Sequence, residues 1–247
     1  KRGVHAAEKI RPLLDQDVQW LVSQANMPMM LTLAPEKTTN GQIKMLQKAG
    51  ITVCAGHSDA LSEDINEALN QGLAGFTHLF NAMRGMESRE PGVVGAALAD
   101  ADSYCSIIAD GHHVHPDMIK IAYTAKAQGK LYLVSDAMAT VGGDQDFILY
   151  GETISEQQGR LVNSEGKLAG SAIALIDAVR ICHQSVGLPI EECLKMASLY
   201  PAQFIKADKV LGRIQSGFTA NLVHFDESFC VHHTWLDGCL AQHNTKK

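Results

Sequence analysis

The chain has 247 residues, of which 46% are hydrophobic and 19% are charged, and its formal net charge is −6. This composition is ordinary for a globular domain, and no apolar run approaches the roughly 18–20 residues that would span a membrane. The acidic balance and the lack of a basic stripe exclude a typical nucleic-acid-binding surface.

Five apolar runs in the first part of the chain predict β-strands, at Met29–Leu33, Ile51–Ala55, Gly75–His78, Tyr104–Ala109 and Leu131–Ser135. Helical spacing predicts helices between them, at Gln42–Ala49, along the stripe of Leu61, Ile65 and Leu69 up to Gly72, and from Pro116 onward. Strands that alternate with helices in this way indicate a parallel α/β sheet with right-handed crossovers.

In the rest of the chain the sequence pattern departs twice from the alternation of strands and helices. The stretch Gly142–Gly170 is rich in glycine, which predicts an inserted hairpin or a long loop, and helices are predicted after it at Ala172–Val186 and Ile190–Ala197. Beyond Gly212 the pattern predicts short β segments at Ala220–Phe225, Phe229–His232 and Trp235–Leu236, with a turn at Asp237-Gly238.

The number of strand–helix units bears on the fold. A closed (β/α)8 barrel needs eight units and typically about 250 residues by itself, whereas this chain offers about five. A five-stranded open sheet also fits, but functional candidates at successive strand ends favour an incomplete barrel of the TIM type. We predict that residues 1–211 form the C-terminal part of a barrel and residues 212–247 supply strands of a small β-sandwich domain. We also expect the chain to lack an N-terminal segment.

Six cysteines, at positions 54, 105, 182, 193, 230 and 239, show neither a Cys-x-x-Cys pair nor a disulfide framework. Those at 54, 105 and 182 lie in apolar runs, where a reduced core thiol is the usual state. We therefore expect a cytoplasmic location.

Two histidines follow successive predicted strands, His57 in Ala-Gly-His-Ser and His78 in Phe-Thr-His-Leu. A single histidine at a strand end is more often a hydrogen-bonded structural residue. Here one helix separates the two strands, so the strands should be adjacent and parallel, about 4.8 Å apart, with both imidazoles at one edge. This predicts two ligands of one metal ion, which normally has a third protein ligand, often a carboxylate.

Asp136 directly follows the Leu131–Ser135 strand. One interpretation is that it caps the segment behind it. The other is that it points into the mouth of the barrel and acts as a general base on the attacking water.

Further candidates lie in predicted loops. Asp110–His113 ends the fourth strand, and one of its histidines could orient or polarise a substrate carbonyl, although the pair His232-His233 shows that adjacent histidines alone prove little. Arg84 and Arg89 are either solvated charges or donors to a phosphate, which suits the planar guanidinium.

Eight short motifs together resemble the N-acetylglucosamine-6-phosphate deacetylases of the amidohydrolase superfamily. They are LAPE at 33–36, AGHS at 55–58, THLFNAM at 77–83, REPG at 89–92, ADGHHV at 109–114, SDA at 135–137, LAGS at 168–171 and MASLYPA at 196–202. Each motif is weak by itself, but the set runs nearly from end to end in the family's order.

The resemblance implies roles for individual residues. His57 and His78 would be metal ligands, and Asp136 would be the catalytic acid and base. The substrate would be contacted by Val4, His5, Asn81, Ala82, Arg89, His113, Leu168, Ala169 and Gly170. The arginine would reach into the site of a neighbouring subunit in a homodimer.

The family's third metal ligand is a glutamate in a His-Leu-Glu-Gly-Pro-like stretch, expected upstream of Lys1, and neither Glu36 nor Glu90 matches it. The implied reaction is hydrolysis of the N-acetyl group of N-acetylglucosamine 6-phosphate, in amino-sugar catabolism. The implied cofactor is a divalent metal, zinc first, with iron, manganese and cobalt as alternatives.

Two alternatives stay open. The first is another enzyme of the same superfamily, dihydroorotase-like or a deaminase, which would carry a His-x-His motif near its first strand. The second is a sugar-phosphate-binding protein without activity, or an inactive fragment of a deacetylase. The presence of His57, His78 and Asp136 argues against the binding protein.

Overall fold

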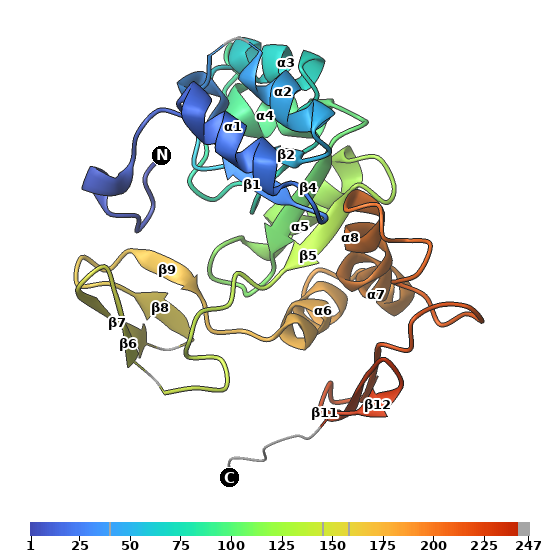
Figure 1. The fold of residues 1–247 in the computed structure, drawn as a ribbon. Coiled ribbons are helices and arrows are strands. Elements are labelled where there is room, and N and C mark those ends of the chain that lie inside the picture. The colour runs from blue at the N-terminus through green and yellow to red at the C-terminus, as the bar shows by residue number, and fades with distance from the viewer. Residues whose placement is uncertain (40, 145, 158, 242–247) are drawn as a thin grey trace.

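A computed structural model describes residues 1–39, 41–144, 146–157 and 159–241. At its centre is a parallel sheet whose strands lie side by side in chain order: β1 (Met30–Leu33), β2 (Thr52–Ala55), β3 (Gly75–Phe76), β4 (Tyr104–Ile108) and β5 (Leu131–Val134). Each strand pairs with the next, so the sheet forms an arc of a barrel (Figure 1). The predicted incomplete barrel of five strand–helix units is confirmed.

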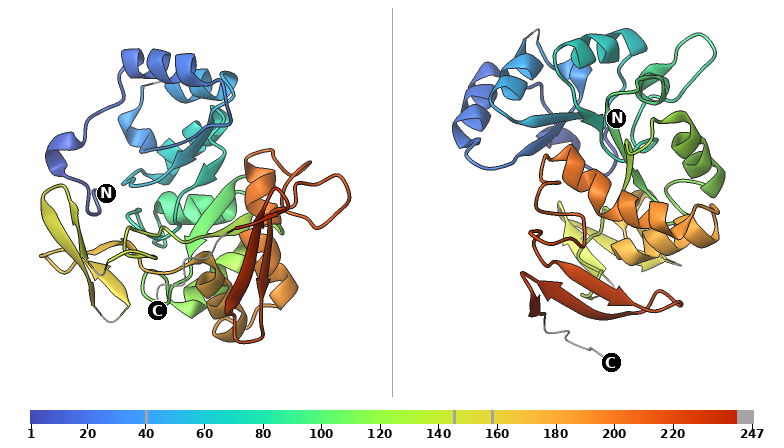
Figure 2. Two further views of the ribbon diagram at one scale, coloured as in Figure 1. Left: turned by 60° about the horizontal axis from the view of Figure 1, so that its bottom comes forward. Right: turned by 90° about the vertical axis from the view of Figure 1, so that its right-hand side faces the viewer.

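Helices surround the outer side of this arc (Figure 2). They are α1 (Asp15–Gln24), α2 (Gln42–Lys48), α3 (Ser62–Asn70), α4 (Gly92–Ala99), α5 (Pro116–Ala125), α6 (Leu175–Gln184), α7 (Ile190–Ala197) and α8 (Leu199–Phe204), with short 3-10 helices η1 (Ala7–Lys9) and η2 (Pro35–Lys37). The last three α-helices pack against β5. Among the described residues, none of the helices combines the length and apolarity of a membrane span.

The hydrophobic core fills the space between sheet and helices. Phe76, Ile107 and Ile65 are fully buried in it, and each such side chain contributes about 1.5–3 kcal/mol relative to exposure. Of the residues in the predicted apolar stripe, Ile65 is buried in α3 as expected, but Leu61 precedes α3 and is 43% exposed. Cys54, Cys105 and Cys182 are free and buried, which confirms the predicted core thiols, and Cys193 is a further buried thiol that was not predicted.

Some elements differ from the sequence-based prediction. Helices α1, α4 and α8 were not expected, and α4 is apolar on every side, so it carries no amphipathic signal. β3 ends at Phe76 rather than His78, because the backbone of His78 turns to a positive φ. Helix α6 begins only at Leu175.

The insertion between β5 and α6 is larger than the predicted hairpin or loop. It forms an antiparallel sheet of β6 (Asp146–Leu149), β7 (Glu152–Gln157), β8 (Arg160–Val162) and β9 (Leu168–Ser171). Ile154, Leu161 and Ala169 make a small core of its own. A β-bridge between Ala137 and Ser171 ties this sheet to the end of β5, beside Asp136.

A third sheet follows the helices: β10 (Leu222–Phe225), β11 (Val231–Leu236) and β12 (Cys239–Leu240). The predicted separation of Phe229–His232 from Trp235–Leu236 is wrong, because β11 runs without interruption while Phe229 lies in the preceding turn with φ of 64°. The predicted Asp237-Gly238 turn is confirmed. The domain division at 211/212 stays a prediction, and residues 242–247 of the predicted small domain lie outside the described residues.

Candidate metal and catalytic site

Three candidate residues occupy equivalent positions at the carboxyl edge of the sheet. His57, His78 and Asp136 are each the second residue after a strand, namely β2, β3 and β5. Each has a left-handed backbone, with φ of 51°, 42° and 51°. Such conformations are uncommon for residues other than glycine, cost about 1–3 kcal/mol, and cluster at functional sites. The same strained turn ends all three strands.

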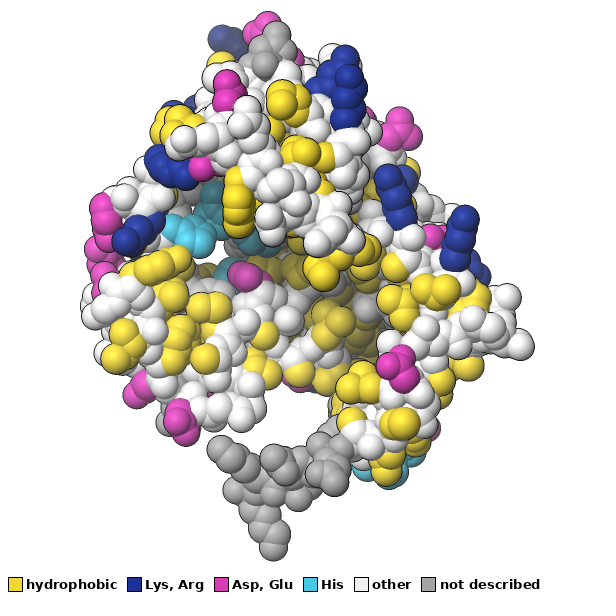
Figure 3. Space-filling model, in the orientation of Figure 1, with side chains coloured by type: hydrophobic (Ala, Val, Ile, Leu, Met, Phe, Trp, Pro, Cys, Tyr) yellow, Lys and Arg dark blue, Asp and Glu magenta, His cyan; other side chains and the backbone are white. Residues whose placement is uncertain are grey.

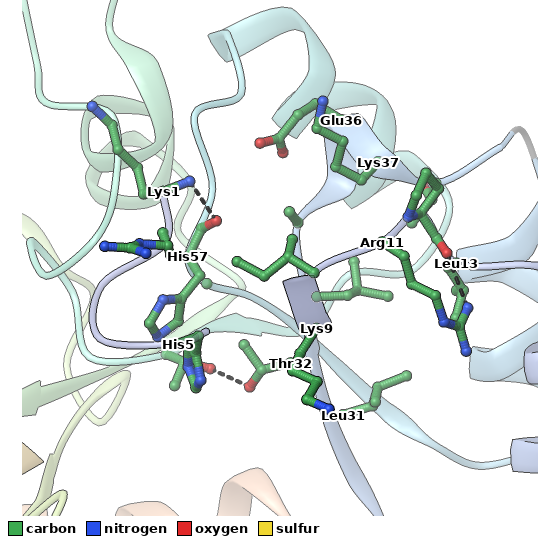
Figure 4. A pocket seen from close by; sticks show the side chains of 18 of the residues that line it. Lys1, His5, Lys9, Arg11, Leu13, Leu31, Thr32, Glu36, Lys37 and His57 are labelled. Carbon is green, nitrogen blue, oxygen red and sulfur yellow. Dashed lines mark hydrogen bonds between the residues drawn. The ribbon is translucent and has the colours of Figure 1, made fainter. Parts of the chain in front are cut away.

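The imidazoles of His57 and His78 face each other across this edge. Their Nε2 atoms lie 3.1 Å apart. The backbone N–H of His78 donates to the buried Oγ of Ser106 at 2.7 Å, which fixes the turn after β3. The carbonyl of His57 accepts a hydrogen bond from the backbone nitrogen of Lys1 at 2.9 Å (Figure 4).

This pair suits a single metal ion. Two nitrogens that share an ion at about 2.0–2.1 Å lie roughly 2.9–3.4 Å apart for angles between 90° and tetrahedral. The observed separation of the two Nε2 atoms, 3.1 Å, falls within this range. The Nδ1 atoms of His57 and His78 are buried and have no hydrogen-bond partner among the described residues. The two rings therefore fit the role of metal ligands.

Electrostatics favour the neutral imidazoles that metal binding requires. Burial, followed by the nearby His78 and His5, lowers the pKa of His57 to about 4. Burial also lowers the pKa of His78, although the neighbouring Asp136 opposes this effect.

No third side chain completes a metal-binding set with these two histidines among the described residues. Glu36 is close but has another function, since its carboxylate accepts hydrogen bonds from Ser58 Oγ and from the N–H of Asp59, both at 2.7 Å. Glu36 therefore positions the loop that follows His57.

His113 is oriented by a buried carboxylate. Its Nδ1 lies 2.6 Å from Oδ2 of Asp110, and Oδ1 of Asp110 accepts the backbone N–H groups of His112 and His113 at 2.8 Å each. Burial alone would raise the pKa of Asp110, but these hydrogen bonds outweigh burial and lower it. The side chain of His113 is thus held with Nε2 available to a ligand.

All predicted site residues except Arg89 surround one cavity of about 370 Å³. From the predicted set it is lined by Val4, His5, His57, His78, Asn81, Ala82, His113, Asp136, Leu168, Ala169 and Gly170. These residues come from the N-terminal segment, the strand ends and β9. Figure 3 shows histidine side chains at the back of a hollow above the four-stranded sheet.

Sequence reasoning missed several residues of this cavity. Met138, Leu149 and Tyr150 also line it. Leu149 is the last residue of β6 and Tyr150 begins the turn to β7, and no local pattern indicates that this end of the strand would reach the histidines. The positioning role of Asp110 could have been found, because it stands in the same motif as His113.

Arg89 lies away from the cavity. It is exposed in the loop before α4, whereas the neighbouring Glu90 holds that loop by accepting the N–H groups of Ser62 and Gly92, each at 2.8 Å. Arg84 is occupied elsewhere, since its guanidinium binds the carbonyl and carboxylate of Asp59.

A larger, open cavity of about 950 Å³ adjoins the first beside β1. It shares His5, His57, His78 and Asp136 with the smaller cavity. Lysine and arginine side chains line it, namely Lys1, Arg2, Lys9, Arg11 and Lys37, and Figure 4 labels all of these except Arg2. The strand-end residues are therefore reached from a broad opening whose rim carries positive charge.

Comparison with known proteins gives consistent matches. The amidohydrolase family matches residues 19–240. The chain is 38% identical to an N-acetylgalactosamine-6-phosphate deacetylase of Shewanella sp. (strain ANA-3), over 96% of this chain and 60% of the relative. It is 36% identical to an N-acetylglucosamine-6-phosphate deacetylase of Vibrio furnissii, over 97% of this chain and 61% of the relative.

Among solved structures, the N-acetylglucosamine-6-phosphate deacetylase from Pasteurella multocida superimposes with a TM-score of 0.93 at 37% identity. The match covers 98% of this chain and 64% of that one. The chain thus spans about 60% of the length of the curated relatives that it matches.

Proposed function

The chain belongs to the amidohydrolase family, and we propose that its protein hydrolyses the N-acetyl group of N-acetylglucosamine 6-phosphate to glucosamine 6-phosphate and acetate. The observation that carries this proposal is the convergence of two histidines, a carboxylate and an oriented third histidine on one cavity of about 370 Å³. The deacetylase relatives support the substrate class.

The residues divide the chemistry among themselves. His57 and His78 would hold a divalent metal, which supplies Lewis acidity toward the amide carbonyl and the attacking water. Asp136 accepts a proton as water adds to the carbonyl carbon. It then delivers that proton to the nitrogen as the C–N bond breaks, so the amine leaves uncharged, and the acetic acid formed releases its proton to solvent to give acetate.

Other residues orient the substrate. His113, whose Nδ1 is held by Asp110, presents Nε2 to the acetamide group. Val4, His5 and the β9 segment Leu168–Gly170 border the sugar, and Asn81 with Ala82 lies toward its phosphate. The apolar side chains of Met138 and Leu149 limit the access of further water.

The cofactor, assembly and compartment are also proposals. Zinc suits a site of imidazole and carboxylate ligands, and iron, manganese or cobalt would be held by the same donors. A homodimer would explain the exposed position of Arg89, which would then bind the phosphate in the partner's site.

Six free cysteines support a reducing compartment such as the cytoplasm. The deacetylase relatives make a dihydroorotase-like or deaminase reaction the weaker hypothesis.

A specific observation favours a second substrate, because the relative that is 38% identical is named for the galactosamine epimer. The two substrates differ only in the orientation of one hydroxyl at carbon 4. One hydrogen bond to it is worth about 0.5–1.5 kcal/mol, which corresponds to roughly 2- to 10-fold in kcat/KM.

Acetate release from the two epimers tests the proposal. We expect both epimers to be hydrolysed, with kcat/KM for N-acetylglucosamine 6-phosphate higher by roughly 2- to 10-fold. A higher kcat/KM for N-acetylgalactosamine 6-phosphate would instead make that epimer the preferred substrate. If neither phosphosugar releases acetate from the metal-loaded whole protein, the deacetylase proposal fails.

The proposed role of Arg89 makes a separate prediction. Arg89→Ala should raise KM for the phosphorylated sugar by roughly 10- to 150-fold, since a charge-assisted contact is worth about 1.5–3 kcal/mol. KM for unphosphorylated N-acetylglucosamine should hardly change. Arg84→Ala is the matched control, because the Arg84 guanidinium is bound to Asp59 and its loss should affect both substrates alike. Equal losses for Arg89→Ala would show that Arg89 is structural.

A further inference from the structure

The hairpin of β10 and β11 gathers potential metal ligands far from the cavity of the parallel sheet. Within ten residues the sequence places His224, Asp226, Cys230, His232 and His233. Ligand atoms of Asp226, Cys230 and His232 all lie within 4.8 Å of one another. Thus thiol, imidazole and carboxylate donors meet at one exposed turn.

A β-bulge brings these side chains together. In the register of the hairpin, His224 pairs with His233 and Phe225 pairs with Val231, so His232 is the extra residue on its strand. Regular alternation would point His232 and His233 to opposite faces, but a bulge re-aims a side chain. Both rings accordingly lie 5.5 Å from the His224 ring, measured between centroids.

Asp226 organises the turn and keeps one oxygen for a ligand. Its Oδ1 accepts hydrogen bonds from the N–H groups of Ser228 and Cys230 and from the Ser228 hydroxyl. Its Oδ2 faces Nε2 of His232 at 2.8 Å. The hydrogen bonds from Ser228, Cys230 and His232 lower the pKa of Asp226, so it stays a carboxylate at neutral pH.

We propose that Asp226, Cys230 and His232 form a second binding site for a divalent transition metal of the zinc class. A metal ion would replace the proton between Asp226 Oδ2 and His232 Nε2, and the Cys230 thiol would release its proton to solvent on binding. The typical bond lengths are about 2.3 Å to sulfur and 2.0–2.2 Å to nitrogen and oxygen. Three protein ligands leave a fourth position for water or for His224.

The chemistry of the donors separates this site from the proposed catalytic one. A thiolate ligand selects soft or borderline ions and excludes magnesium and calcium, which require oxygen. His57 and His78 offer only imidazole nitrogen at the other site. Thiolate coordination therefore reports on the hairpin alone, whether or not the proposed deacetylase function holds.

Cobalt(II) is the probe, because thiolate coordination gives a near-ultraviolet charge-transfer band that imidazole and carboxylate ligands do not give. The whole protein, kept reduced and freed of metal, is titrated with cobalt(II), and zinc is then added to compete. We expect a thiolate band that saturates with cobalt, that zinc abolishes and that magnesium leaves unchanged.

Two serine substitutions make a matched pair. Cys230→Ser should remove the band and weaken binding at the hairpin by at least roughly tenfold, since loss of even an outer partner of a metal ligand typically costs 10- to 100-fold. Cys239→Ser changes another exposed cysteine of the same sheet, outside the cluster, and should leave the band intact. His232→Gln should weaken binding while keeping the thiolate.

The proposal is overturned if no thiolate band appears, or if the band survives Cys230→Ser. Loss of the band in Cys239→Ser alone would equally reject the assigned ligands. Far-ultraviolet circular dichroism of each variant shows that the hairpin substitutions leave the fold intact.

Discussion

Replacing Asp136 with asparagine in the whole protein should lower kcat for acetate release by roughly 100- to 10,000-fold, or about 3–5 kcal/mol of transition-state stabilisation. Asparagine has nearly the same shape as aspartate but cannot accept the proton of the attacking water. Asp136 lies beside the two histidines at the end of β5, in the same left-handed turn that they adopt. Metal content should stay close to that of the wild type, because His57 and His78 are unchanged.

The control is the same substitution at an exposed carboxylate. Asp117→Asn alters a side chain that is 83% exposed at the start of α5, and it should leave kcat unchanged. Acetate release and metal analysis on the same preparations separate loss of the base from loss of metal. A near-normal kcat for Asp136→Asn would remove Asp136 from the mechanism.

Much of the fold could be predicted because its signals are local. The alternation of apolar runs and helical stripes identified all five parallel strands, and the chain order of the sheet follows from the crossover rule. The elements that were not predicted are those whose formation depends on tertiary context. Helix α4 is buried all round, so it lacks a polar face, and the four-stranded insertion is built from strands of only three to six residues, which carry weak sequence signals.

The residues of the site also divide into those that local sequence signals predict and those that depend on tertiary context. His57, His78 and Asp136 could be predicted because each follows a strand, and parallel strands end at one edge. Their positive φ could not be predicted, since that strain persists only where the surrounding structure enforces it. Tyr150 was missed because it reaches the cavity from a turn about 70 residues away along the chain from His78, and such proximity has no local signal.

The second large effect concerns the metal. His78→Gln should remove one of the two imidazoles whose Nε2 atoms lie 3.1 Å apart, and a metal at this site should then bind at least roughly tenfold more weakly. Acetate release should fall with the metal content. His115→Gln is the matched control, because that imidazole is 71% exposed at the N-terminus of α5 and lies outside the cavity.

Fold integrity must be checked for this variant, because His78 is buried in the turn after β3. Its backbone hydrogen bond to Ser106 does not involve the ring, so the thermal unfolding midpoint of the metal-free proteins should change little. If metal binding survives His78→Gln at full strength, the ion is held elsewhere.

The most direct measurement is a titration of metal-depleted protein with zinc while acetate release from N-acetylglucosamine 6-phosphate is followed. It is best made in the Cys230→Ser background, so that the hairpin does not take up metal. The rate should rise from near zero, reach a plateau at about one equivalent of zinc per chain, and stay flat in His78→Gln. Full activity in the chelated protein, or an undiminished response in His78→Gln, would contradict a hydrolytic site built on His57 and His78.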